Sequence, residues 1–343
     1  MLQEAAFKAA PERNVTDWLI RRAHRRYGLP DAPRNTHVTA AWAALGASGY
    51  AIDKGVGDGT GVCEMDVLAK LKLTDMFWNK TDGKISSPAA PLCLEFASWG
   101  SLNAAAPAIK AAAEHVTVVG QKSKSAIPQT FSYDLINTAR EVLAQLSIPM
   151  LLNFSAAFSA SSLSAAQINA TADQFVELLS DMESLLATDT AFMLGPWLAS
   201  ARKLGGSATD CTDTQIEGDI GDCANFMEWN AKAQLTTWYP VIGSAAAPHA
   251  PQGTRDHDYA RKQWSGLLAD VQIPRARLFQ RQALQNAAAG QPFNDTAASA
   301  SYTMQSFKWQ TDFGNHYPTE PKGDAVAIST ALREKYASYF GSC

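Results

Sequence analysis

Residues 162–188 read SLSAAQINATADQFVELLSDMESLLAT. Apolar side chains recur every three or four residues along this stretch, at Leu163, Ile168, Phe175, Leu178, Leu179, Met182 and Leu185. That spacing puts them on one face of an α-helix, because a helix completes a turn in about 3.6 residues. A helix with one apolar face must pack against other elements, so the stretch predicts one member of a larger helical assembly.

The remainder of the chain repeats this periodicity. Short alternating runs of β-branched residues are nearly absent. Helices are predicted over 15–27, 37–50, 102–119, 133–158, 192–204, 214–238, 257–289, 299–313 and 325–340, with bends at Pro149 and Pro274. We therefore expect an all-α fold, an antiparallel multi-helix bundle with long irregular loops, two of them at 51–66 and 79–94. A composition shift near 120–130 favours a smaller N-terminal helical part, 1–120, and a main bundle, 130–343, within one domain.

Composition excludes several classes of protein. The 343 residues are 46% hydrophobic and 18% charged, with a net charge of -4. This balance argues against a nucleic-acid partner, and the short basic run at 21–26 is interpreted as a solvated helix face. No apolar run approaches the roughly 18 residues of a membrane span, so no membrane partner is expected. The cysteines and histidines show no metal-ligand spacing, and we expect neither a metal nor a cofactor.

Acceptor sequons point to the secretory pathway. The motif Asn-X-Ser/Thr occurs at Asn14, Asn79, Asn153, Asn169 and Asn294. The first fourteen residues contain no apolar signal segment, so a signal peptide is expected upstream of this chain. The five cysteines are compatible with disulfides, for which Cys63 with Cys93 and Cys211 with Cys223 are two candidate local pairs.

The segment 227–268 concentrates aromatic rings and carboxylates. It contains Trp229, Trp238, Trp264, Tyr239 and Tyr259 together with Asp256 and Asp258. Such rings can stack on the C–H faces of a sugar while polar groups bind its hydroxyls, or they can simply form the core of a helical hairpin. Asp256 with Asp258, or either with Glu228, has the residue types of a glycosidase acid/base pair, although carboxylates near helix starts are more often N-caps.

Ordered motifs in the second half of the chain resemble one enzyme family. They are FMLGPWLASAR at 192–202, EWN at 228–230 with QLTTWYP at 234–240, DYARKQ at 258–263 with GL at 266–267, and YP at 317–318 with PKGD at 321–324. Together they resemble the C-terminal helical region of lysosomal α-N-acetylglucosaminidases, glycoside hydrolase family 89. Residues 192–338 match best, and 1–191 match more loosely, through RRYG at 25–28 and FWNKT at 77–81.

The resemblance implies a retaining enzyme that removes terminal α-linked N-acetylglucosamine from heparan sulfate-type glycans. In that family the two catalytic glutamates lie on a (β/α)₈ barrel that precedes the helical domain. We expect that barrel to be absent from this chain, so no catalytic residue is assigned and the chain alone is expected to be inactive. The upstream barrel is then its partner, and homo-oligomerisation stays open. The alternative is a non-catalytic helical binding module that has lost its barrel.

The same resemblance assigns pocket residues. Two aromatic wall positions of the family fall on Trp238 and Tyr259, and an aliphatic one falls on Asp256. Two departures affect this assignment: the family's W-G-P is here Trp238-Tyr239-Pro240, and the connection to Tyr259 is longer. The expectation is one wall of a sugar pocket in a lysosomal or secreted glycoprotein.

Overall fold

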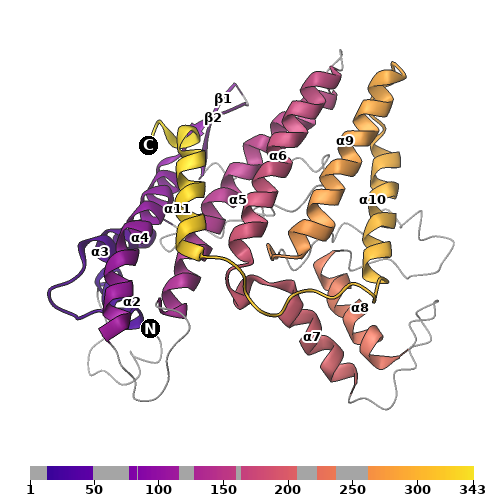
Figure 1. Ribbon diagram of the computed structural model, residues 1–343. Helices are drawn as coiled ribbons and strands as arrows, with labels where there is room; N and C mark the ends of the chain where they lie inside the picture. Colours follow the sequence, from indigo (N-terminus) through magenta and orange to yellow (C-terminus); the bar gives the residue numbers. More distant parts are fainter. Residues whose placement is uncertain are drawn as a thin grey trace. The chain divides into compact units, whose positions relative to one another are not determined.

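The structure is a computed structural model that describes residues 14–48, 77–82, 84–115, 127–159, 164–206, 222–236 and 262–343 (Figure 1). Most of these residues are helical, and the one sheet among them has two strands, which confirms the predicted all-α class. The α-helices are α2 Val15–Arg26, α3 Thr36–Ala47, α4 Ala90–His115, α5 Gln129–Ser159, α6 Ala165–Leu186, α7 Leu194–Gly205, α8 Cys223–Leu235, α9 Ile273–Ala288, α10 Asp295–Gln310 and α11 Ala325–Tyr336. Short 3₁₀ segments cover Thr190–Phe192 (η1) and Ala337–Phe340 (η4), and a π-helical segment covers Leu268–Gln272 (η3).

The chain divides into two compact units. Of the described residues, those up to 142 and those in 324–343 belong to the first unit, and those in 143–323 belong to the second. Helix α5 contributes residues to both, because the division falls between Val142 and Leu143. The domain division predicted near 120–130 falls largely outside the described residues and stays a prediction.

The first unit contains α2, α3, α4, α11 and the start of α5. Helix α3 packs against α2 and α4, and α11 packs against α4. Asn14 caps α2, because its side chain accepts a hydrogen bond from the backbone N–H of Asp17. In the core, the hydroxyl of Tyr27 donates to Asp134 (2.8 Å) and accepts from the indole N–H of Trp42 (3.0 Å). These bonds satisfy polar groups that burial would otherwise penalise.

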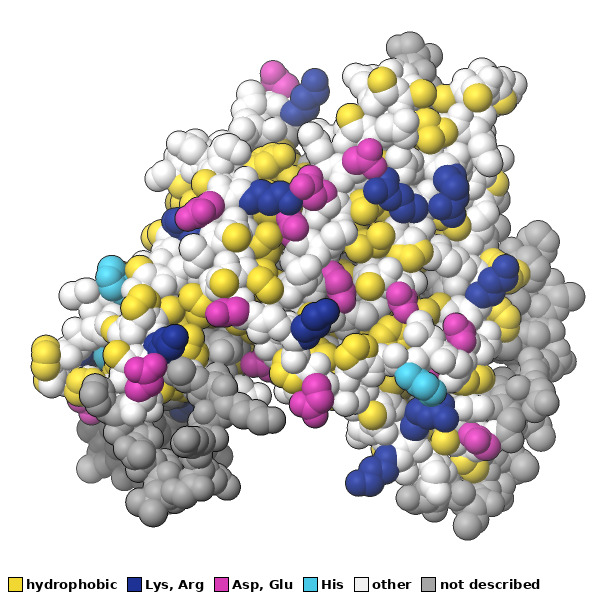
Figure 2. Space-filling view, in the orientation of Figure 1, with side chains coloured by type: hydrophobic (Ala, Val, Ile, Leu, Met, Phe, Trp, Pro, Cys, Tyr) yellow, Lys and Arg dark blue, Asp and Glu magenta, His cyan; other side chains and the backbone are white. Residues whose placement is uncertain are grey.

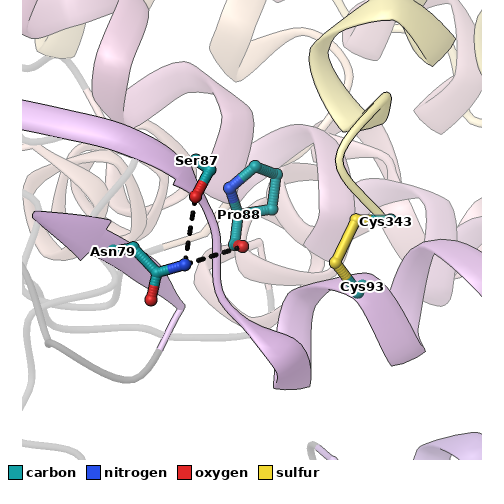
Figure 3. The surroundings of a disulfide bond; sticks show 5 residues. All are labelled: Asn79, Ser87, Pro88, Cys93 and Cys343. Carbon is teal, nitrogen blue, oxygen red and sulfur yellow. Dashed lines mark hydrogen bonds between the residues drawn. A yellow bond between two sulfur atoms is a disulfide. The ribbon is translucent and has the colours of Figure 1, made fainter.

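The predicted irregular loop over 79–94 is wrong. Strands β1 (Trp78–Thr81) and β2 (Lys84–Pro88) form an antiparallel hairpin with a register irregularity at Asn79/Lys80, and α4 begins at Ala90. The side-chain N–H group of Asn79 donates to the Ser87 hydroxyl (3.0 Å) and the Pro88 carbonyl (3.2 Å) (Figure 3). Strands of four and five residues are too short for a clear alternation, so the sequence pattern does not reveal them.

The predicted local disulfide between Cys63 and Cys93 is wrong. Cys93 at the start of α4 bonds to Cys343 at the C-terminal end, not to Cys63 (Figure 3). The ring of Phe96, three residues along α4, stacks on Phe340 with centroids 4.2 Å apart. Cys223 is disulfide-bonded as well, while Cys63 and Cys211 lie outside the described residues. Pairing over a long sequence separation has no local signature, which is why spacing alone suggests the wrong partner for Cys93.

Neither Pro149 nor Pro274 interrupts a helix: Pro149 lies inside α5, and Pro274 lies in the first turn of α9. Helix α5 continues as one assigned helix past Pro149, so no new helix starts there. Within the described residues, α5 is also the one helix whose length and hydropathy would allow a membrane span, but 61% of its apolar window is buried inside the fold, as in a core helix. Pro274 lies in the first turn of α9, where its missing N–H removes no helical hydrogen bond, and η3 precedes it.

Helix α6 of the second unit has one buried apolar face. The predicted apolar face of α6 is buried at Ile168, Phe175, Leu178, Leu179, Met182 and Leu185, whereas Leu163 lies outside the described residues. This face packs against α9 and η3, and α7 packs against α8. A second apolar cluster joins α7, α8, α10 and the segment at η3 through Leu194, Leu198, Ala231, Leu235, Leu267, Val271 and Trp309.

Candidate functional site

The three predicted pocket residues, Trp238, Asp256 and Tyr259, all belong to the segment 237–261, which lies outside the described residues. The structure describes what comes directly before and after that segment. Helix α8 and Thr236 precede it, and residues 262–268 follow it. Both of these flanking stretches belong to the second unit.

Before the segment, α8 is fixed by a buried ion-pair group. Glu228, 1% exposed, pairs with Arg202 of α7 (2.5 Å) and with Lys232 one turn further along α8 (2.6 Å). Lys232 is fully buried, donates to the backbone carbonyl of Asp312 (2.7 Å) and lies 5.3 Å from the ring centroid of Trp309. Since both carboxylate oxygens of Glu228 face cations, the structure uses this residue to join helices. The acid/base role considered for Glu228 finds no support in these contacts.

The last residue before the segment, Thr236, is also anchored. Its hydroxyl donates to the carbonyl of Lys232 (2.9 Å) and accepts from the side-chain amide of Gln310 in α10 (2.7 Å). Thr236 and Gln310 are both buried. The backbone is thereby held in place two residues before Trp238.

After the segment, residues 263–266 attach to the start of α7. The backbone N–H of Ser265 donates to the carbonyl of Phe192 (2.8 Å), and the N–H of Leu194 donates to the carbonyl of Ser265 (2.9 Å). Glu183 of α6 adds a clamp, because its carboxylate accepts bonds from the Ser265 hydroxyl (2.7 Å) and the Gly266 N–H (2.9 Å). Burial raises the pKa of Glu183 above its usual value, and these hydrogen bonds oppose that rise.

Glu183 is a residue that the sequence analysis missed. Its partners Ser265 and Gly266 are more than eighty positions away, so no local pattern links them. A signal is nevertheless present in the sequence. Glu183 stands next to the apolar face of α6, four residues after Leu179 and three before Leu186, where an acidic side chain needs a specific partner.

Two motif glycines allow close packing at the same place. Gly266 has φ +90°, and a Cβ built there would lie 2.8 Å from the ring of Tyr317. A Cβ on Gly195 would lie 1.9 Å from the carbonyl oxygen of Pro318. Both positions therefore require glycine, one for its backbone conformation and both for space.

Tyr317 stands at the centre of a polar cluster beside Gly266. Its hydroxyl donates to Asp270 (2.7 Å) and accepts from the indole N–H of Trp309 (2.7 Å), and the Asn315 side chain also donates to Asp270 (2.7 Å). Burial, followed by the contact with Asp270, raises the pKa of Tyr317 far above its ordinary value. The tyrosine is thus a neutral hydrogen-bonding group that fixes the 266–270 turn.

The motifs that carry the family resemblance thus meet in space. The motif at 192–202 contacts the one at 228–230 through Arg202 and Glu228, and it contacts 317–318 through Gly195. The end of the 258–267 motif contacts the motif at 192–202 through Ser265 and the motif at 317–318 through Gly266. These four motifs are far apart in the sequence, and they pack against one another at the two ends of segment 237–261.

The predicted sequon asparagines are all exposed: Asn14, Asn79, Asn153, Asn169 and Asn294. Asn14 and Asn294 cap helices through their side-chain oxygens, which leaves the nitrogen that would carry a glycan unused by the cap. Asn169 accepts from Gln280 in the same way (2.8 Å). In Asn79, by contrast, the nitrogen itself donates two hydrogen bonds within the hairpin.

The predicted absence of a nucleic-acid partner stays a prediction, and the visible described surface carries charges of both signs (Figure 2). Figure 2 shows Lys and Arg side chains interspersed with Asp and Glu over the visible described face, without a single basic patch. Among the described residues, no group of three or more His, Cys, Asp or Glu side chains is placed to hold a metal ion.

The all-α fold and the assembled motifs define a helical domain of the glycosidase type. The chain belongs to the family of alpha-N-acetylglucosaminidase (NAGLU) C-terminal domains, whose family model matches residues 18–335. It is similar to human alpha-N-acetylglucosaminidase, with 26% identity over 342 residues, which cover 98% of this chain and 37% of the human protein.

Solved structures of Clostridium perfringens proteins share the fold. CpGH89 in complex with its substrate GlcNAc-alpha-1,4-galactose matches 99% of this chain and 34% of its own, with a TM-score of 0.67 and 17% identity. The family 89 glycoside hydrolase in complex with PUGNAc matches 95% and 32%, with a TM-score of 0.63 and 18% identity. The chain therefore spans roughly a third of the length of the relatives it matches.

Proposed function

We propose that this chain is the helical part of a retaining α-N-acetylglucosaminidase and supplies one wall of its sugar pocket. The observation that carries the proposal is the convergence of the family motifs at both ends of segment 237–261. Anchors at Thr236 and Ser265 would present Trp238 and Tyr259 from a rigid support, which is what a preorganised pocket requires. Trp238 would stack on the sugar or its acetyl methyl, and Tyr259 would add a ring face and a hydroxyl.

The catalytic glutamates would come from a (β/α)₈ barrel of the parent protein, and none is assigned in this chain. Asp256, close to Tyr259 in sequence, would face water at the pocket rim, because an ion in an apolar contact would be costly. The substrate would be a glycan of the heparan sulfate type with terminal α-linked N-acetylglucosamine. A relative's bound substrate, GlcNAc-alpha-1,4-galactose, supports the terminal sugar but leaves the rest of the glycan to be tested.

Turnover of an aryl α-N-acetylglucosaminide is the first measurement. We expect none from this chain alone, since the proposed acid and nucleophile are not on it. Turnover that disappears in Asp258→Asn would contradict the proposal and return catalysis to the 256–258 carboxylates.

The pocket wall is tested in the protein reunited with its barrel. We expect Trp238→Ala to lower kcat/KM about fivefold, because an aromatic stacking contact is worth roughly 1 kcal/mol. The melting temperature should stay within about 2 °C of wild type if the ring faces the pocket. Unchanged kinetics would reject the pocket role, whereas loss of folding would make Trp238 a core residue.

We also propose a lysosomal or secreted glycoprotein. The Cys93–Cys343 disulfide and the bonded Cys223 fit an oxidising compartment, and the five exposed sequons fit glycan attachment. Expression through a eukaryotic secretory pathway, followed by enzymatic deglycosylation and peptide mass analysis, tests this. We expect Asn14 and Asn294 to be occupied more fully than Asn79, whose nitrogen is hydrogen-bonded. Unmodified asparagines at all five positions would contradict it.

A further inference from the structure

The second unit exposes a pair of tryptophans that the proposed pocket does not use. Trp197 of α7 is 41% exposed, although large aromatic side chains are mostly buried in folded proteins. Its ring lies 5.8 Å from that of Trp264, centroid to centroid, at an interplanar angle of 56°. The two indoles thus form an angled aromatic surface, here called the Trp197/Trp264 platform.

The platform is held by the same backbone contacts that anchor the pocket segment. The bonds between Ser265 and the residues on either side of Met193 place Trp264 next to the first turn of α7. Trp264 also packs against the apolar cluster that contains Leu194 and Leu198. Because these contacts fix the platform before any ligand arrives, binding to it would cost little ordering of the protein.

A positive charge accompanies the aromatic rings. The ammonium of Lys262, an exposed residue, lies 5.5 Å from the ring centroid of Trp264. Indole faces bind the apolar C–H faces of a sugar, and an ammonium binds a sulfate or a carboxylate. The combination fits an acidic saccharide better than a neutral one.

We propose that the Trp197/Trp264 platform and Lys262 form a binding site for an acidic sugar unit of the glycan, beyond its terminal residue. Trp264 stands five positions after Tyr259, a distance along the chain of at most about 17 Å. The site therefore lies within reach of the proposed pocket. The inference rests on the proposed function, since it gives the outer part of the same glycan its own contact.

Charge favours a glycan over a nucleic acid at this place. A nucleic-acid surface needs several cations to track successive phosphates, whereas among the described residues Lys262 is the one cation placed over the rings of the platform. An interface with a second copy of this chain is the other occupant that the experiment must separate.

The test titrates this chain with a heparin-derived tetrasaccharide that lacks a terminal N-acetylglucosamine, with its desulfated form, and with N-acetylglucosamine alone. Calorimetry reports Kd, and sedimentation velocity reports the oligomeric state. The variants are Trp197→Ala, Trp197→Phe and Lys262→Gln. Leu204→Ala is the matched control, because Leu204 is 67% exposed on the same helix and has no part in the platform.

We expect Trp197→Ala to raise the Kd for the sulfated tetrasaccharide about tenfold, with Trp197→Phe in between and Leu204→Ala unchanged. Lys262→Gln should raise it about threefold, with a smaller effect on the desulfated sugar, which keeps only its carboxylates as anions. No binding by the wild-type chain, or equal binding by Trp197→Ala, would overturn the inference. So would a Trp197→Ala variant that changes only the oligomeric state.

The proposed pocket can fail independently. Trp238→Ala should weaken binding of N-acetylglucosamine and leave the tetrasaccharide without that terminal sugar unaffected. If Trp238→Ala changes nothing while Trp197→Ala still weakens the tetrasaccharide, the pocket assignment falls and the acidic-sugar site stands. The reverse pattern rejects the platform and keeps the pocket.

Discussion

The two units each bury a glutamate, and they treat it in opposite ways. Glu228 in the second unit is 1% exposed and has a cation at each carboxylate oxygen. Glu95 in the first unit is 3% exposed, and its Oε2 atom has no hydrogen-bond partner among the described residues. Burial, and then the like charge of Glu141, raise the pKa of Glu95 to about 8, while Arg140 lowers it. Equal burial therefore yields a paired ion in one unit and a neutral acid in the other.

The largest expected effect comes from breaking the ion pair. Lys232→Met removes the fully buried partner of Glu228 and leaves a carboxylate with only the partly exposed Arg202. We expect a loss of about 3–5 kcal/mol in the free energy of unfolding, because an uncompensated buried charge is costly. Urea unfolding followed by circular dichroism measures it, and peptide-resolved hydrogen exchange should assign the loss to the second unit.

A double variant, Glu228→Leu with Lys232→Met, is the control for this prediction. Replacing both charges with apolar groups removes the desolvation penalty, so we expect it to be more stable than Lys232→Met alone. A Lys232→Met protein as stable as wild type would show that Glu228 is not held as an ion.

A somewhat smaller effect, and one that depends on pH, is expected at Glu95. Its folded-state pKa of about 8 lies above the ordinary glutamate pKa of 4.5, so the folded state binds the proton more tightly than the unfolded state does. This stabilisation is fully present below about pH 4.5 and is lost as the pH rises through about 8. Glu95→Gln should therefore raise stability at pH 9 relative to wild type, by on the order of 3 kcal/mol, and change it little at pH 4.

Melting temperatures of both proteins between pH 4 and pH 9 test this expectation. Glu141→Gln is a graded control, because it removes the like charge that also raises the pKa of Glu95. Its curve should lie between those of wild type and Glu95→Gln. Parallel curves for wild type and Glu95→Gln over the whole range would mean that Glu95 does not titrate between pH 4 and pH 9.

The smallest of the three effects concerns Glu183, which combines features of the other two glutamates. It is partly buried and has neutral donors, Ser265 and Gly266, instead of cations. Glu183→Gln keeps one acceptor oxygen and loses the charge, so we expect a destabilisation of about 1 kcal/mol. Exchange protection at the Gly266 amide should fall more than the global stability does. Equal protection in both proteins would argue against the clamp.

Local features of this fold follow from the sequence, and distant pairings do not. The apolar face of α6 and the Asn14 cap depend on residues within a few positions of each other, so periodicity and capping rules predict them. The β1–β2 hairpin is too short to produce a pattern. The Cys93–Cys343 bond depends on a separation of 250 residues, which no local rule encodes.

The candidate site shows the same limit. Motif order indicates which family the chain belongs to, and it assigns Trp238 and Tyr259 by resemblance. It does not reveal that Arg202 and Lys232 pair with Glu228, or that Glu183 clamps Ser265, since these contacts exist only after the helices pack. Nor does it reveal Trp197 as the neighbour of Trp264, which lies 67 positions further along the chain. The aromatic segment 227–268 thus contributes to two surfaces, a proposed pocket wall and the platform.

The disulfide between Cys93 and Cys343 closes the chain into a covalent ring that includes the whole described second unit. A single proteolytic cut anywhere between these cysteines would leave both fragments attached to each other. Such a nicked molecule would migrate as one species on a non-reducing gel and as two after reduction. A protease-rich compartment could therefore cut this chain once without releasing either piece.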